Sequence, residues 1–288
     1  MTCIKNKILP LLLLLEMSDG CTSNYRESYR SEPPLMALYA ELCPDSAVTV
    51  RLTHTFRIFE DPVDDPVVPG AMVILWQGRT PLDTLTFQTG IGKYTGNFHI
   101  IPLEEYYVTA THPDYPALIT EKVVVPLFPD IVNTEIRDTT YTDNNGLHRD
   151  VYISLGYKQF TSPDKYLIFN TFFNKSQRIY PRLLQECGKE SFINIAFSGV
   201  NLNCLQEEGT LVLKAEGVPR TDGIPDTLTL NMGTTSPFFY NYYLALEEQA
   251  SANTDQVFFQ PVLVNSNLNG GYGALLTKNE QQFKIILP

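Results

Sequence analysis

Apolar and polar residues alternate along most of the chain from Leu35 onward. Val48, Val50 and Leu52, for example, are separated by single polar residues, which is the period-two pattern of a strand with one buried face. Further apolar or alternating segments, with turn residues between them, predict the strands 71–76, 82–88, 93–100, 105–111 and 118–125. Short strands at this spacing, without amphipathic helices between them, predict an all-β sandwich for residues 34–126.

A second β-rich region is predicted at residues 127–288. The two prolines of Pro126-Leu-Phe-Pro129 indicate a stiff connector, because proline cannot donate a hydrogen bond inside a central strand. Beyond this connector, alternation predicts the strands 147–155, 166–173, 192–197, 210–216, 226–232, 258–264, 272–276 and 283–287. The expected fold class is therefore mainly β, with a first β-sandwich followed by a second, larger sandwich-type domain.

One segment, residues 236–250, breaks the alternation and predicts a late α-helix. Ser236 and Pro237 form a helix-start signal, because serine caps the first free N–H groups and proline tolerates the first helical position. The residues that follow are mostly good helix formers. Its five aromatic residues would point in most directions around the helix axis, so we expect much of this helix to be covered.

The first 20 residues have the features of an export signal. Two lysines precede a short apolar run, Leu9–Leu15, and small residues then lead to Cys21. The run is far shorter than the roughly 20 residues that span a bilayer. A cysteine in this position is typical of bacterial lipoproteins, in which the signal is cleaved before the cysteine and the cysteine is acylated. We expect lipidation of Cys21 and a flexible tether at 21–33; secretion without lipidation is the alternative.

Composition limits the partners of the chain. Its 32 acidic and 21 basic residues give a formal net charge of −11, which repels phosphate backbones and argues against nucleic-acid binding. The same charge argues against a basic patch that binds anionic lipid, so membrane attachment should depend on the acyl chains. A hydrophobic content of 43% and a charged content of 18% indicate a folded chain.

The cysteines suggest one structural pairing. An exported chain folds in an oxidising compartment, where Cys187 and Cys204 could close a short disulfide loop. Cys43 would then remain as a free thiol that packs as a small apolar residue. The alternative is three buried thiols, because spacing alone does not determine pairing. We expect no metal site and no cofactor, since the cysteines and histidines lack zinc-type spacing.

Candidate chemistry is sparse. The chain has no GxSxG nucleophile elbow and no HExxH motif, so we assign no catalytic residues. Asp143, Asn145 and Asp150 form an oxygen-rich group of the kind that hard cations prefer, but a polar hairpin turn is the simpler interpretation. The glycine-rich segment Asn269–Gly273 lacks the Lys and Ser or Thr of a phosphate-binding loop. We expect it to form a tight turn that another backbone segment approaches closely.

Three segments carry a resemblance to a known family. They are the block from Leu35 to Pro126 with VTVRLTHT, PGAMVILW, GKYTGNFHI and YYVTATHPDY, the late helix SPFFYNYYLAL, and the ending VFFQPVLVNSNLNGGYGALL. In order and spacing they resemble a family of Bacteroidota outer-membrane lipoproteins, domain of unknown function 4249, over nearly the whole mature chain. The resemblance implies a lipid-anchored protein of two β parts, of which the first is immunoglobulin-like or transthyretin-like. It also implies that the gene lies beside a gene for a TonB-dependent receptor. It implies no catalytic residues.

Together these observations predict a binding protein rather than an enzyme. We expect it on the outer membrane or cell surface, on the periplasmic or extracellular face, attached through Cys21. Its expected partner is a TonB-dependent transporter or a nutrient-uptake system. Two other classes of function remain open: a secreted or surface hydrolase that acts on glycans or peptides, and a structural or adhesion spacer protein.

Overall fold

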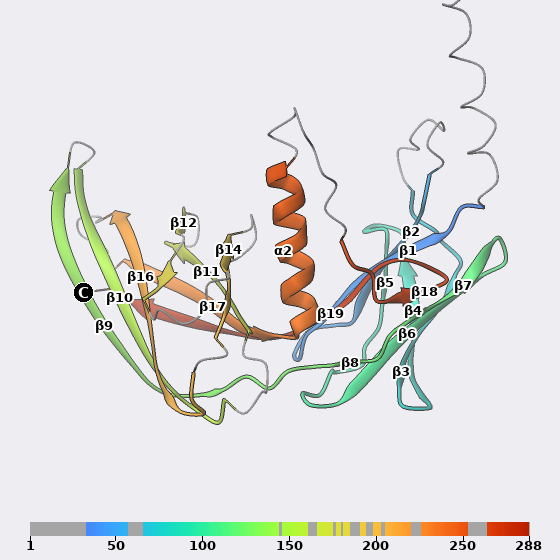
Figure 1. Cartoon of the computed structure of the whole chain (residues 1–288), viewed down its shortest axis with the longest axis horizontal. Coiled ribbons are helices and arrows are strands. Elements are labelled where there is room, and N and C mark those ends of the chain that lie inside the picture. The colour runs from blue at the N-terminus through green and yellow to red at the C-terminus, as the bar shows by residue number, and fades with distance from the viewer. Residues whose placement is uncertain are drawn as a thin grey trace, which may run out of the picture.

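The computed structural model describes residues 33–56, 66–143, 146–160, 166–174, 177–179, 181–184, 191–193, 198–202, 205–219, 226–252 and 264–287. Within these residues the protein is mainly β, with strands in several sheets and a single α-helix (Figure 1). The fold class predicted from the alternation of apolar and polar residues is therefore confirmed.

The first unit is a β-sandwich. Its strands are β1 (Met36–Leu42), β2 (Thr49–His54), β3 (Met72–Gln77), β4 (Thr80–Gln88), β5 (Lys93–Thr95), β6 (Glu105–His112), β7 (Tyr115–Thr120) and β8 (Val123–Val124). β1, β2 and β5 form one layer and β3, β6 and β7 the other, while β4 pairs with both β3 and β5. The buried apolar side chains of both layers form one core between them.

Two predicted strands of this unit end differently from the prediction. The strand expected at 93–100 stops at Thr95, because the carboxylate of Asp83 accepts the N–H groups of Asn97 (2.7 Å) and Phe98 (3.1 Å). Those backbone groups therefore bond to a side chain instead of a neighbouring strand. The strand expected at 118–125 is divided into β7 and β8, which both pair with β6.

The second unit is also built from two sheets. Its strands are β9 (Asp130–Asp143), β10 (Gly146–Lys158), β11 (Tyr166–Phe173), β12 (Gln177–Ile179), β13 (Arg182–Leu183), β14 (Ser191–Ile193), β15 (Ser198–Asn201), β16 (Gly209–Pro219) and β17 (Thr227–Thr235). One sheet has the order β13-β16-β10-β9, and the other contains β14, β15, β11 and β17. A second apolar core lies between the sheets. β9 was not predicted, because most of its side chains are exposed and it lacks the hydrophobic signal.

The C-terminal strand joins the two units. β19 (Gly271–Ile286) pairs in parallel with β1 through residues 271–277 and antiparallel with β17 through residues 278–286. The two strands predicted at 272–276 and 283–287 are therefore one. β18 (Leu268–Asn269) pairs with β7, so residues 268–277 of the predicted second domain complete the sheets of the first.

Glycines permit the parallel pairing of β1 with β19. A Cβ atom on Gly271 would lie 2.3 Å from the carbonyl oxygen of Met36, and one on Gly273 would lie 1.9 Å from that of Leu38. Gly273 also has a φ of +116°, which residues other than glycine rarely adopt. The close backbone approach predicted for this glycine-rich segment is confirmed.

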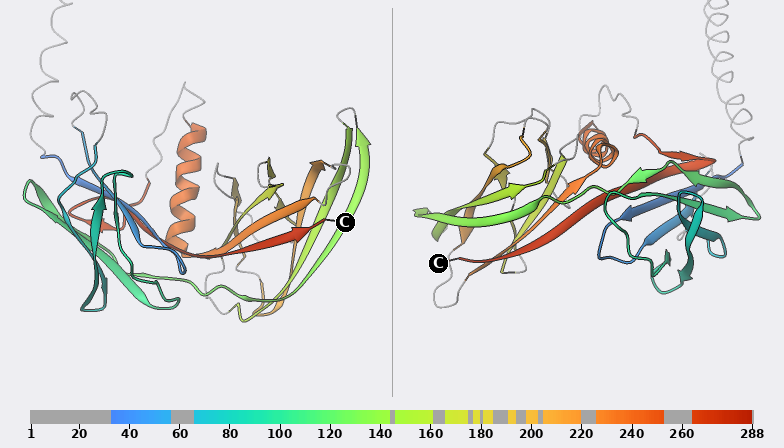
Figure 2. Two further views of the ribbon diagram at one scale, coloured as in Figure 1. Left: turned by 180° about the vertical axis from the view of Figure 1, so that it is seen from behind. Right: turned by 90° about the horizontal axis from the view of Figure 1, so that it is seen from below.

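Helix α2 (Pro237–Ala252) stands on the sheet where the two units meet (Figures 1 and 2). Its predicted start is confirmed, since the N–H of Phe239 donates a hydrogen bond of 3.2 Å to Oγ of Ser236. Phe239 and Tyr240 are fully buried against Ala274 and Leu276 of β19. No helix in the described part of the chain is both long enough and apolar enough to cross a bilayer.

Candidate functional site

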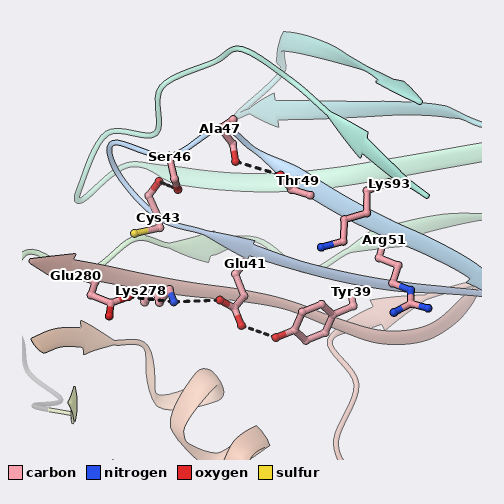
Figure 3. Close-up of a pocket in the computed structure, with 10 residues that line it drawn as sticks. All are labelled: Tyr39, Glu41, Cys43, Ser46, Ala47, Thr49, Arg51, Lys93, Lys278 and Glu280. Atoms are coloured by element: carbon pink, nitrogen blue, oxygen red, sulfur yellow. Dashed lines mark hydrogen bonds and ion pairs between the residues drawn. The ribbon is translucent and has the colours of Figure 1, made fainter. Parts of the chain in front are cut away.

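A hollow of about 520 Å³ opens on the sheet beside helix α2 (Figure 3). The neighbouring strands β19, β1, β2 and β5 all contribute to its lining. On β1, Tyr39 and Glu41 alternate with fully buried apolar residues, so both side chains lie on the face that carries the hollow. On β19, Lys278 and Glu280 line the same hollow.

Glu41 is the centre of a hydrogen-bonded network in this hollow. Its carboxylate accepts hydrogen bonds from the hydroxyl groups of Tyr39 on β1 and Tyr243 on helix α2, the latter at 2.9 Å. The two hydroxyl oxygens are themselves 2.6 Å apart. The ammonium group of Lys278 lies 3.2 Å from Glu41 and 3.2 Å from Glu280. Two strands and the helix are therefore linked through one carboxylate.

The electrostatics of the network hold its groups in defined protonation states. Burial opposes ionisation of Glu41, but the charge of Lys278 and the two tyrosine hydroxyls outweigh it, so the pKa of Glu41 lies below its ordinary value. Burial also opposes the charge of Lys278, yet Glu41 and Glu280 raise its pKa. Burial and the negative charge of Glu41 raise the pKa of both Tyr39 and Tyr243. At neutral pH the tyrosines are neutral donors, while Glu41 and Lys278 are charged.

Two further cations, Arg51 and Lys93, line the hollow. Arg51 lies opposite Tyr39 in the pairing of β2 with β1, and Lys93 is the first residue of β5. Both side chains are exposed, and neither forms an ion pair with any described residue. The hollow therefore contains three cations and the two carboxylates of Glu41 and Glu280, in a chain whose overall charge is −11.

Cys43 lies on the wall of the hollow. It is a free thiol, as predicted, but it is half-buried and lines the hollow rather than packing within an apolar core. Burial raises its pKa, so the protonated thiol predominates at neutral pH. The hydroxyl group of Ser46 donates a hydrogen bond of 3.0 Å to the backbone carbonyl of Cys43. Its interaction with the thiol lowers the pKa of Cys43, but less than burial raises it.

The sequence reasoning did not identify this site. Glu41 and Lys278 are separated by more than 200 residues, and no local motif connects them. A weak signal was present, because a glutamate within the apolar segment MALYAEL requires a partner if the segment is a buried strand. The identity of that partner depends on the parallel pairing of β1 with β19.

The predicted site residues lie elsewhere. Cys21, Cys187, Cys204 and Asn145 are outside the described residues, so lipidation and the disulfide remain predictions. Asp143 ends β9 and is opposite Gly146 of β10, which is the hairpin pairing of the simpler interpretation. Asp150 forms an ion pair of 2.9 Å with Lys214 and accepts the N–H of Gly217 at 3.3 Å. Among the described residues, no three His, Cys, Asp or Glu side chains are grouped as metal ligands.

Comparison with known proteins identifies the family. Similar solved structures include one of manganese lipoxygenase of Gaeumannomyces graminis with part of a zonadhesin of Komagataella pastoris (7% identity, 70% of this chain and 89% of that chain, TM-score 0.22). Also similar is a membrane-anchored protein from Corynebacterium diphtheriae (12% identity, 70% of this chain and 54% of that chain, TM-score 0.22). A third is the collagen adhesin of S. aureus (9% identity, 89% of this chain and 97% of that chain, TM-score 0.20). No curated protein matches the chain significantly. Residues 23–284 match the family described as Domain of unknown function (DUF4249), and the chain belongs to that family.

Proposed function

We propose that this protein is an exported binding protein that captures a small organic anion with hydroxyl groups in the hollow between β1, β2, β5 and β19. One observation carries the proposal: Arg51 and Lys93, which form no ion pair with a described residue, share a hollow with the hydrogen-bonded network around Glu41. A ligand carboxylate would bind Arg51 and Lys93, and ligand hydroxyl groups would bind the carboxylate of Glu280.

The arrangement supports binding more than catalysis. A general base needs a free lone pair and a pKa near the working pH, but Glu41 already accepts two tyrosine hydroxyls and pairs with Lys278. A cysteine nucleophile needs an activated thiolate, but burial raises the pKa of Cys43. The cations Arg51 and Lys93 form no ion pair with a described residue, and they would attract a charged ligand without breaking its bonds.

Titration calorimetry with glucuronate as the probe and glucose as its uncharged counterpart tests this proposal. We expect heat of binding with glucuronate and none with glucose. Replacing Arg51 or Lys93 by glutamine should weaken binding about tenfold or more, because each removes a charge-assisted hydrogen bond. Arg79→Gln is the matched control, since Arg79 is an exposed arginine in the turn between β3 and β4. Equal behaviour of glucuronate and glucose would contradict the proposal.

The setting of this binding protein is a further part of the proposal. The export signal and Cys21 support a lipid anchor on the outer membrane or cell surface, where the protein would deliver its ligand to a TonB-dependent transporter. Metabolic labelling with radioactive palmitate should mark the native chain and not Cys21→Ala. Equal labelling of both would refute acylation at Cys21. Purification of the anchored protein from solubilised envelopes should recover the transporter, and recovery of surface-fibre subunits instead would favour an adhesion role.

A further inference from the structure

Strand β9 (Asp130–Asp143) forms a long free edge. It is 14 residues long, and in the described structure it ends the sheet of order β13-β16-β10-β9. Figures 1 and 2 show it at the outer margin of the second unit. Every second residue of an edge strand directs its N–H and C=O groups away from the sheet, which offers a template for another strand.

β9 lacks several features by which proteins protect such edges. It is long, contains no proline, and exposes Val132 (54%) and Tyr141 (40%). Its pairing with β10 is regular from Asn133 to Asp143, and the register shifts only near the beginning of the strand. The central and last parts of β9 are therefore an uninterrupted edge.

The middle of β9 has a charge pattern that complements itself. Glu135 and Arg137 flank Ile136, and both charged side chains are on the solvent face, with 61% and 83% exposed. When such a segment is rotated by 180° and placed beside itself, each glutamate lies opposite an arginine. We propose that β9 pairs antiparallel with β9 of a second copy of this chain, about a two-fold axis that passes midway between the two copies of Ile136.

The two-fold geometry selects this register. An axis perpendicular to the sheet keeps each residue on the same face in both copies, so one residue must lie directly opposite its own copy, with the axis midway between them. An axis at Glu135 or Arg137 would place like charges directly opposite each other, which is destabilising. An axis between the two copies of Ile136 forms Glu135–Arg137 pairs on both sides and aligns the regular part of the strand from Asn133 to Thr139.

The core face of β9 supports the same axis. Ile136 is half-buried, lies opposite Ile153 of β10, and packs against the core of the second unit. In the proposed pair, the two copies of Ile136 would be neighbours on this face, so the apolar layer would continue from one copy to the other. The pairing would join two four-stranded sheets into one sheet across the axis.

Charge exchange tests the register directly. Sedimentation velocity over a series of concentrations, with the full chain carrying Cys21→Ser to prevent acylation, should show a reversible dimer. Arg137→Glu alone or Glu135→Arg alone should weaken dimerisation roughly tenfold or more, because each change replaces two attractive cross-strand pairs with repulsive ones. The double variant Glu135→Arg/Arg137→Glu should restore dimerisation, since opposite charges again face each other.

Arg182→Glu provides the matched control. Arg182 is an exposed arginine on β13, at the other end of the same sheet, and its reversal should leave the dimer unchanged. Circular dichroism of every variant should match the native spectrum, because all the changed side chains are exposed. A native chain that stays monomeric at all concentrations would overturn the proposal. So would a dimer that the single exchanges leave intact, or one that the double exchange does not restore.

Discussion

Replacement of Gly273 by alanine tests whether the two units are joined as the structure shows. Gly273 lies in the parallel part of β19 and has a φ of +116°. A Cβ atom added to it would lie 1.9 Å from the carbonyl oxygen of Leu38. A normal carbon–oxygen contact is about 3.3 Å or longer. The strands would have to separate locally by more than an ångström, which would disrupt adjacent hydrogen bonds of the β1–β19 ladder.

The expected cost follows from these two effects. The unfavourable φ contributes about 1–2 kcal/mol, and the loss of one or two ladder hydrogen bonds contributes about 1 kcal/mol each. We therefore expect Gly273→Ala to lower the free energy of unfolding by about 3 kcal/mol. Gly70 has a φ of +77°, but a Cβ added there would have no atom within 4 Å, so Gly70→Ala should cost only about 1 kcal/mol.

Urea titration followed by tryptophan fluorescence measures these differences. Trp76 is the only tryptophan of the chain, and in the first unit it stacks on Tyr107 with a ring-centroid distance of 5.9 Å. Its emission therefore reports unfolding of the unit that β1 and β19 complete. Gly90→Ala is the control, because Gly90 has neither a positive φ nor an atom within 4 Å of an added Cβ, and alanine should be neutral or stabilising by up to about 1 kcal/mol.

The series separates conformational strain from steric contact. If Gly273→Ala costs no more than Gly70→Ala, the close parallel approach of β19 to β1 is incorrect. If all three variants have equal stability, neither the positive φ values nor the close contact contributes to folding. Only the order Gly273, Gly70 and Gly90, from most to least destabilising, agrees with the structure.

Three further predictions concern stability. Asp226→Ala should cost about 3 kcal/mol in urea titration followed by circular dichroism, because it leaves the guanidinium group of Arg149, 1% exposed, without its closest carboxylate; a cost below about 1 kcal/mol would contradict this. Folding lowers the pKa of Glu41, so its ionised carboxylate stabilises the folded protein. This contribution to the free energy of unfolding should be complete above about pH 4.5 and be lost as the pH falls through the pKa of Glu41 in the folded protein. The free energy of unfolding of Glu41→Gln should not show this loss at acid pH. If the variant and the native chain lose stability equally as the pH falls, Glu41 does not make this contribution. Ser236→Ala should cost about 1 kcal/mol through loss of the helix cap, and no change would place the helix start elsewhere.

Local sequence patterns identified the elements that have one buried and one exposed face. The strand expected from Val48, Val50 and Leu52 is β2, and the signal at Ser236 and Pro237 begins helix α2. These predictions succeed because side-chain direction repeats every second residue in a strand, and because a helix cap is formed by residues close in sequence. β9 was not predicted, because an edge strand with mostly exposed side chains does not need alternating apolar and polar residues.

The candidate site could not be predicted in the same way. Glu41, Arg51, Lys93 and Lys278 are on four different strands, and none is part of a recognisable motif. They share one hollow because β19 returns from the C-terminus and lies in parallel beside β1, while Tyr243 reaches Glu41 from helix α2. A sequence pattern does not state which strand will be the neighbour of another when hundreds of residues separate them.

The sequence by itself determined the mainly β class, the late helix and the glycines that permit close backbone contact, because each depends on residues within a few positions of one another. Tertiary structure alone decided that one strand serves both units, that a half-buried glutamate meets a distant lysine, and that β9 ends its sheet in the described part of the chain. Those features depend on which strands pair, and pairing is set by the packing of the whole chain.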